Sequence, residues 1–222
     1  MSLAWKWGVT VVLFLIAAVA AVILVIALLG TPPTVEYASG AAGQPVNVNL
    51  QTVGAFGSGN HPDWVSYMVR SPQGQWVHTT LFQVPEHTRI NVTIYQYDSG
   101  SPLRNQQLGL VTGTYGNSAQ LNGKRIQVIN SNAGNGVAHT FTIPSLGINV
   151  PLYANNGNAT LCAAAPCTLK SVHNLIRFSF TSPGSGNYRW QCFVPCGLGW
   201  LFGNGGPMST LGYMGGFMKV VA

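Results

Sequence analysis

Residues 188–222 read YRWQCFVPCGLGWLFGNGGPMSTLGYMGGFMKVVA, and this stretch decides how the rest of the chain is interpreted. It holds two cysteines, Cys192 and Cys196, with three residues between them. A glycine-rich loop that carries methionines then leads to a closing strand at Phe217–Val221. We interpret the chain upstream as a framework that holds this loop outside a membrane, against one earlier histidine.

Short strand patterns fill the chain upstream of that stretch. They alternate apolar and polar residues or are rich in β-branched and aromatic residues, and Gly, Pro, Asn and Ser separate them. The expected strands are Val46–Val53, Val77–Val84, Arg89–Tyr97, Ile126–Ile129, His139–Ile143, Ile148–Leu152, Asn174–Thr181 and Tyr188–Gln191. A short helix is expected at Asp63–Val69, within a Gly/Ser/Pro-rich connection. The pattern predicts an all-β fold, a β-sandwich or barrel.

An uncharged apolar segment comes before the strands. Residues 8–29 would span roughly 33 Å as a helix, which is enough to cross a bilayer. Lys6 precedes the segment, Trp5 and Trp7 are placed as interfacial anchors, and prolines at 32–33 end it. We expect a retained single-pass cell-membrane anchor rather than a cleaved signal peptide, with the N-terminus cytoplasmic and the remainder extracytoplasmic.

The expected organisation has three parts. Residues 1–30 form the anchor, residues 31–45 form a linker, and residues 46–222 form the extracytoplasmic domain. We expect insertions in this domain at about 98–125, 153–172 and 203–212.

Composition excludes several classes of function. Charged residues make up 6% of the chain, with ten basic residues, four acids and a net charge of +6. The basic residues are scattered, so no nucleic-acid partner is expected. No nucleophile–base motif, phosphate loop or carboxylate pair is present, and four acids offer little for general acid–base catalysis. We therefore expect a subunit or electron carrier that is not itself an enzyme.

The C-terminal half resembles a known family. In order it carries His139-Thr140-Phe141, the LGINV run at 146–150, an FSFT strand, a PGSG turn, YRWQ and Cys192-x-x-x-Cys196-Gly197. These motifs resemble the copper-binding cupredoxin domain of subunit II of the haem–copper (cytochrome c or quinol) oxidases, in its variants with a single-helix anchor. The resemblance covers roughly residues 126–222, apart from the insertion at 153–172. It implies a cupredoxin-like Greek-key β-sandwich.

In that family, two histidines, two cysteines, a backbone carbonyl and a methionine hold a two-copper centre. The matching positions here are His139, Cys192, the carbonyl of Val194, and Cys196, all as metal ligands. The second histidine departs from the pattern, because Trp200 occupies its position and no histidine follows residue 173. An indole N–H only donates hydrogen bonds and cannot bind a metal. Met214 is the expected methionine ligand, and Met208 is the alternative.

Three interpretations of Cys192 and Cys196 remain open. The pair could form a disulfide in an oxidising exterior, hold one copper with His139 and a methionine, or persist for packing only. Of these, the sequence slightly favours the disulfide. Cys162 and Cys167 are also expected to form a disulfide, because their loop lacks a nearby ligand set.

The remaining candidates receive structural interpretations. We expect three histidines without a motif to be surface or packing residues: His61, His78 and His87. We expect five apolar residues to pack in the core or the loop: Trp190, Trp200, Leu201, Phe202 and Phe217. The alternative for 200–214 is a contact surface, because apolar side chains on a glycine-rich loop bury poorly in their own domain.

The sequence favours a membrane-anchored, extracytoplasmic subunit of a respiratory or other membrane complex. Its copper site would be degenerate and its role structural or docking, much as subunit II of quinol-using oxidases lacks copper. One alternative is an active copper electron-transfer protein that uses His139, Cys192, Cys196 and a methionine. Another is a copper-binding accessory protein of a different membrane copper enzyme. The cofactor is thus copper or none, and the expected partners are integral membrane subunits and a redox protein.

Overall fold

A computed structural model describes residues 3–29, 32–37, 44–57, 63–155, 162, 164–197, 199–201 and 204–222. Side chains of residues 3–4, 27–29, 199–201 and 204–205 lie outside that description. The chain divides into two units, a helical one at the N-terminus and a β domain that begins at Pro32.

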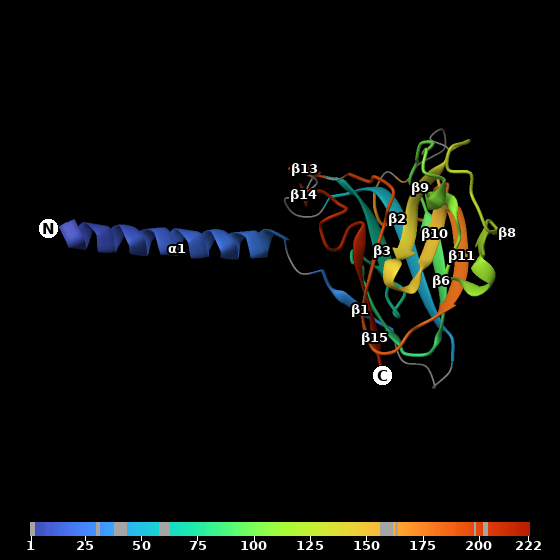
Figure 1. The fold of residues 1–222 in the computed structure, drawn as a ribbon, viewed down its shortest axis with the longest axis horizontal. Coiled ribbons are helices and arrows are strands. Elements are labelled where there is room, and N and C mark those ends of the chain that lie inside the picture. The colour runs from blue at the N-terminus through green and yellow to red at the C-terminus, as the bar shows by residue number, and fades with distance from the viewer. Residues whose placement is uncertain are drawn as a thin grey trace. The chain divides into compact units, whose positions relative to one another are not determined.

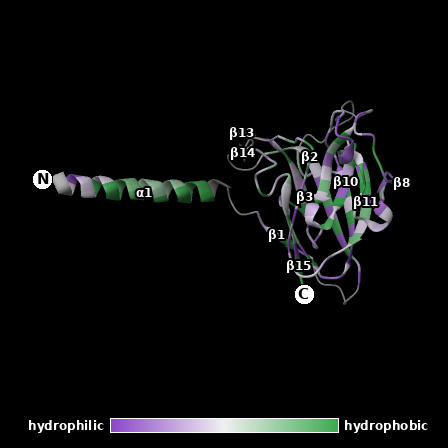
Figure 2. Cartoon of the chain, viewed as in Figure 1, coloured by the Kyte–Doolittle hydropathy of each residue, from purple (hydrophilic) through white to green (hydrophobic). Residues whose placement is uncertain are grey.

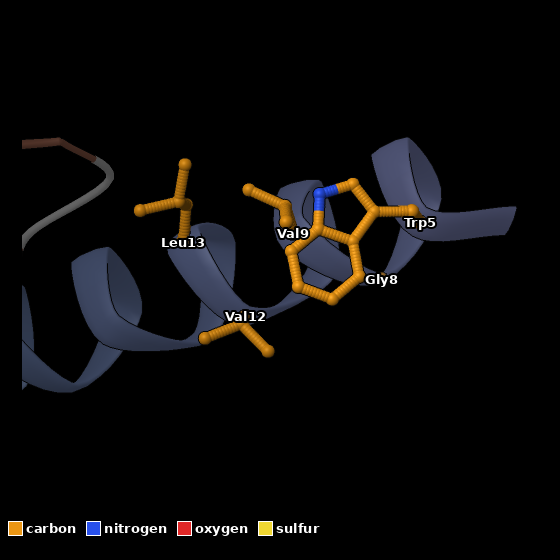
Figure 3. Close-up of a pocket in the computed structure, with 5 residues that line it drawn as sticks. All are labelled: Trp5, Gly8, Val9, Val12 and Leu13. Carbon is orange, nitrogen blue, oxygen red and sulfur yellow. The ribbon is translucent and has the colours of Figure 1, made fainter. Parts of the chain in front are cut away.

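The N-terminal unit is helix α1 (Leu3–Leu29). Trp5–Ile26 has a mean hydropathy of 3.3 and none of it is buried. Figure 2 shows hydrophobic colouring along most of α1. Beside the Trp5 indole, Gly8 leaves a small apolar hollow that Val9, Val12 and Leu13 complete (Figure 3). A helix of this length and composition can anchor a protein in a membrane.

The β domain is a sandwich of two sheets (Figure 1). Sheet A has the strand order β1 (Thr34–Glu36), β5 (Leu81–Pro85), β15 (Gly215–Val221), β12 (Gly186–Gln191), β9 (Val137–Ile143) and β10 (Ile148–Tyr153). Sheet B has the order β4 (Trp76–Val77), β3 (Trp64–Arg70), β2 (Val46–Phe56), β6 (Arg89–Gln96), β11 (Asn174–Thr181), β7 (Ala119–Leu121) and β8 (Lys124–Ile126). The small elements are β13 (Gly199–Leu201), β14 (Asn204–Gly205), and the 3₁₀ helices η1 (Gln106–Gly109), η2 (Tyr115–Asn117) and η3 (Pro144–Leu146).

One core lies between the sheets. Strand β6 shows how it forms, because Ile90, Val92 and Ile94 are buried while the residues between them are more exposed. From sheet A, Trp190 and Phe141 enter the same cluster, with ring centroids 5.0 Å apart. The all-β sandwich expected after one N-terminal helix is therefore confirmed.

The expected helix at Asp63–Val69 is wrong. The segment forms β3, which pairs antiparallel with β2 and contributes Tyr67 and Val69 to the core. Aromatic and β-branched residues dominate it, and these favour a pleated, half-buried strand. Gly and Pro in the flanking connection obscured this pattern.

The single strand expected at Val77–Val84 is two strands in different sheets. Strand β4 pairs with β3 in sheet B, whereas β5 pairs with β1 and β15 in sheet A. Thr80 fixes the crossing, because its Oγ1 donates to the Gly215 carbonyl (2.7 Å) and accepts from the Gly212 N–H (2.9 Å).

The structure adds detail to three further expectations. The strand expected at Ile126–Ile129 ends at Ile126 as β8, with one isolated bridge between Val128 and Leu110. Within the expected linker 31–45, β1 pairs with β5, so part of that segment belongs to sheet A. The expected insertion at 98–125 contains η1, η2 and most of a short hairpin formed by β7 and β8.

Candidate metal centre

His139 lies on β9, the most deeply buried strand of the domain. All seven residues of β9 are buried. Side chains alternate between the faces of a strand, so His139 shares a face with Phe141 and Ile143, which belong to the core. The imidazole therefore enters the interior between the sheets, and its residue is only 3% exposed.

Cys192 directly follows strand β12, which ends at Gln191. It follows Trp190 by two residues and so continues the core-facing side of that strand. Its N–H donates to the Met214 carbonyl (2.8 Å), one step beyond the Gln191–Gly215 pair of the β12–β15 ladder. The loop between these strands thus begins and ends at a fixed pair of residues, Cys192 and Met214.

Two contacts hold the cysteine loop against its neighbours. The Phe193 N–H donates to Thr140 Oγ1 (2.9 Å). The Cys196 N–H points to Met208 Sδ (3.3 Å), which brings the second half of the loop back over the first. Fixing both cysteines before a ligand arrives lowers the entropy cost of binding it.

The donor atoms of three residues converge. His139 Nδ1 lies 2.9 Å from Cys196 Sγ and 3.8 Å from Cys192 Sγ, and the two sulfurs are 3.2 Å apart. Ligands 2.0–2.3 Å from one ion are roughly 3.3–4 Å from each other, so small adjustments would admit an ion here. The Val194 carbonyl lies 3.6 Å from Cys192 Sγ. The structure thus brings together four of the residues that the sequence singled out.

Met208 and Met214 occupy different environments. Met208 Sδ lies beside the Cys196 backbone, as described above, and the side chain is partly buried against the core. Met214 is fully buried in the core, and its backbone pairs with Cys192. Of these two contacts, the one made by Met208 is made by its sulfur, whereas the one made by Met214 is made by its backbone.

The sequence did not single out Asp98, which completes the site. It follows β6 of sheet B, and its Oδ2 lies 2.9 Å from His139 Nε2 on sheet A. Gly54 makes room for the carboxylate, because a Cβ there would lie 2.7 Å from Asp98 Oδ1. By accepting a hydrogen bond from Nε2–H, Asp98 turns Nδ1 toward the cysteines, so that loss of the Nδ1 proton would expose its lone pair there, which is the orientation that a metal-ligating histidine requires.

The charges of the metal-free site are coupled. Burial alone would lower the pKa of His139, but hydrogen bonds to Asp98 and Cys192 outweigh it and raise this pKa to about 9. Burial would raise the pKa of Cys192, yet hydrogen bonds from Cys196 and His139, with the Thr140 N–H, hold it well below its usual range. The Cys192 contact and burial raise the pKa of the Cys196 thiol. We infer an imidazolium beside one shared thiolate.

We predict that Asp98→Asn lowers the pKa of His139 by roughly one to two units, because a neutral amide no longer stabilises the imidazolium. The His139 pKa lies above the ordinary 6.5. Its contribution to stability is therefore complete below pH about 6.5 and lost as the pH rises through about 9. NMR titration of the His139 ring in the reduced, metal-free chain measures the shift. An unchanged midpoint would contradict the role given to Asp98.

The two cysteine pairs differ. Cys162 and Cys167 form a disulfide, with an S–S distance of 2.03 Å, in a small cluster with Val53 and Tyr97. Cys192 and Cys196 are free thiols in the structure, in place of the disulfide that the sequence slightly favoured. The two cysteines are held by different contacts of the loop. These contacts bring the two sulfurs close together without a disulfide bond.

The structure places some of the other candidate residues. His78 packs between Phe56 and Tyr213, consistent with the packing role expected of it. Trp190 is fully buried, and Phe217 is partly buried. The side chains of Trp200 and Leu201, and all of His61 and Phe202, lie outside the described residues.

No family model matches the chain, and no curated protein sequence matches it. Reduced rusticyanin at 1.9 Å is 16% identical, with a TM-score of 0.35 over 85% of this chain and 84% of that chain. Rusticyanin from Thiobacillus ferrooxidans is also 16% identical, with a TM-score of 0.36 over 86% and 84%. A histidine-to-methionine variant of rusticyanin is 15% identical, with a TM-score of 0.36 over 89% and 93%. At this level of similarity, nothing about rusticyanin's own site is transferred to this chain.

Proposed function

We propose that this chain is a membrane-anchored, cupredoxin-like copper protein that binds one copper ion through His139, Cys192 and Cys196. The observation that carries the proposal is the convergence of one imidazole nitrogen and two free thiols, all within 4.8 Å of one another. Thiolate sulfur and imidazole nitrogen together suit copper. The missing second histidine argues for one ion rather than the pair that the resemblance implied.

The protein's own residues prepare this site in three ways. Asp98 fixes the histidine ring. The Thr140 N–H, 3.4 Å from Cys192 Sγ, stabilises negative charge on that sulfur. Burial of His139 and Cys192 limits access of water. When bound, copper would supply one-electron redox chemistry, and a rigid, preformed ligand set suits such a carrier because little rearrangement accompanies a change in charge.

Metal analysis tests this proposal directly. The full chain, reduced and purified in nonionic detergent without chelator, should take up one equivalent of copper and show a thiolate-to-copper absorption band. The absorption band should disappear and return on reduction and reoxidation. One equivalent of zinc in preference to copper, or no metal at all, would overturn the copper assignment.

The thioether provides a sharper test of the site. We predict that Met208→Leu retains copper but changes the visible spectrum and weakens affinity by roughly tenfold, because Met208 Sδ lies against the Cys196 backbone. The matched control is Met214→Leu, a buried substitution of similar volume. It should leave the spectrum unchanged while lowering stability slightly. The reverse pattern would assign the thioether to Met214.

We further propose that the chain works as an extracytoplasmic subunit or docking partner in a membrane complex, such as a respiratory oxidase. Three features support this. Helix α1 is apolar along most of its length, the cysteine motif resembles oxidase subunit II, and Phe193 between the two cysteines is 43% exposed. Purification from native membranes in gentle detergent should recover haem or other membrane subunits with the chain. A lone monomer would contradict the proposal.

A further inference from the structure

A second hollow lies on the outer face of sheet B. It encloses about 370 Å³ and is lined by residues of β6, β11, β7, β8 and η2. In β6 the lining residues Arg89, Asn91 and Thr93 alternate with the buried Ile90 and Val92, so they face away from the core. The floor is therefore the solvent-facing side of the sheet, separate from the interior position of the metal centre.

Three of the ten basic residues of the chain line this one hollow: Arg89, Arg125 and Arg177. Across the sheet, Arg177 pairs with Gln120 and Gln120 pairs with Arg125. Neighbouring strands lie about 4.8 Å apart, which places these two arginines roughly 10 Å apart at Cα. Arg89 pairs with Thr181, four residues along β11 from Arg177. Side chains as long as arginine can meet across such spans.

No acidic residue offsets this charge. None of the twelve lining residues is acidic. The four acids of the chain all lie elsewhere: Glu36 on β1, Asp63 before β3, Glu86 in the β5–β6 turn, and Asp98 on His139. Three guanidinium groups around one hollow repel each other, and a bound anion would relieve that repulsion.

The hollow is also organised for polar recognition. Arg89 Nε donates to Asn91 Oδ1 (3.1 Å), and its guanidinium lies 5.1 Å from the Tyr115 ring centroid. The Arg125 guanidinium lies close to Gly116. A Cβ added to Gly116 would lie 3.2 Å from Arg125 Nη2. Ser118 and Ser179 also line the hollow, but their hydroxyls donate to the Tyr115 carbonyl (3.2 Å) and to Asn91 Oδ1 (2.8 Å). The donors that face a ligand are therefore the guanidinium N–H groups, whose fork matches the oxygens of phosphate and sulfate groups.

We propose that this hollow binds a multiply charged phosphate- or sulfate-type oxyanion through Arg89, Arg125 and Arg177. Three guanidinium groups on three strands offer more than one contact point, which favours a ligand with two or more charged groups, such as a diphosphate. The site is independent of the metal centre and of the proposed redox role.

Calorimetry with inorganic pyrophosphate tests the site. The metal-free full chain in nonionic detergent is titrated at constant ionic strength, so that neither copper chelation nor salt screening contributes. Binding should be saturable with a Kd below about 1 mM, and Arg125→Gln/Arg177→Gln should weaken it at least tenfold. The matched control is Arg189→Gln/Lys219→Gln, which removes the same charge from sheet A and should stay within twofold of wild type.

A second titration distinguishes the source of the anion. Short-chain phosphatidic acid that binds at least tenfold more tightly than pyrophosphate, and loses that binding in the Arg125/Arg177 variant, would identify a lipid headgroup. Equal or weaker binding would identify a free anion. The proposal is overturned if neither probe binds, or if both double variants lose affinity equally, since the effect would then be unspecific charge attraction. Circular dichroism confirms that each variant is folded.

Discussion

We expect Cys192→Ser to abolish stoichiometric copper binding by the full chain, with affinity reduced on the order of 100-fold or more. The serine hydroxyl is a poor substitute for a soft thiolate. The Thr140 N–H also donates to Cys192 Sγ. The site holds the pKa of the Cys192 thiol below its usual range, so it favours a negative charge on this sulfur. Copper per chain after desalting, together with loss of the thiolate-to-copper band, measures the effect.

Two further variants separate ligation from folding. Cys196→Ser should lose copper to a similar extent, although Cys196 is less buried and its replacement disturbs the core less. The matched control, Cys162→Ser/Cys167→Ser, removes the other cysteine pair, which is held as a disulfide. It should bind copper normally while unfolding more readily. Copper binding retained in both single variants would refute the ligand assignment.

We expect Trp190→Ala to lower the free energy of unfolding by about 4 kcal/mol, the range for a fully buried Trp cut back to Ala. The Trp190 ring contacts Tyr67 and Phe141 at centroid distances of 4.9 and 5.0 Å, and its Nε1–H donates to the Thr80 carbonyl (3.0 Å). Its loss would leave a cavity directly beneath the cysteine loop. Guanidinium unfolding in detergent, followed by near-UV circular dichroism, gives the difference.

Two controls assign this effect to core packing. Trp190→Phe keeps one aromatic ring but loses the rest of the indole with its N–H donor, so it should cost about half as much or less. Trp76→Ala removes the same side chain from β4, where the residue is only partly buried. It should cost clearly less than Trp190→Ala. Equal losses at the two tryptophans would contradict a single core centred between the sheets.

Strand periodicity predicted most of the sandwich. Asn174–Thr181 shows why, because its apolar and polar residues alternate from Ile176 onward and the observed β11 has the same bounds. Prediction failed where burial depended on distant partners. Four consecutive residues of β3, Ser66–Val69, are buried, so both faces of that strand are covered, and no local pattern contains that information.

The residues of the metal site, like the strands of the fold, were only partly predicted from the sequence. His139, Cys192 and Cys196 were predicted from the motifs that resemble the oxidase family, and the structure places those motifs on neighbouring strands of one sheet. Asp98 could not be assigned in this way, since it reaches the histidine from the opposite sheet. Its one sequence signal was its rarity, as one of four acids placed at the end of a strong strand. The choice between Met208 and Met214 likewise depended on how the loop folds back.

X-ray absorption at the copper edge tests the central claim most directly. The copper-loaded full chain should show two sulfur scatterers and one nitrogen scatterer at bonding distance, and Cys196→Ser should reduce the sulfur contribution by about half if it retains any metal. A first shell made only of nitrogen and oxygen would contradict the account, because copper would then be bound away from His139, Cys192 and Cys196.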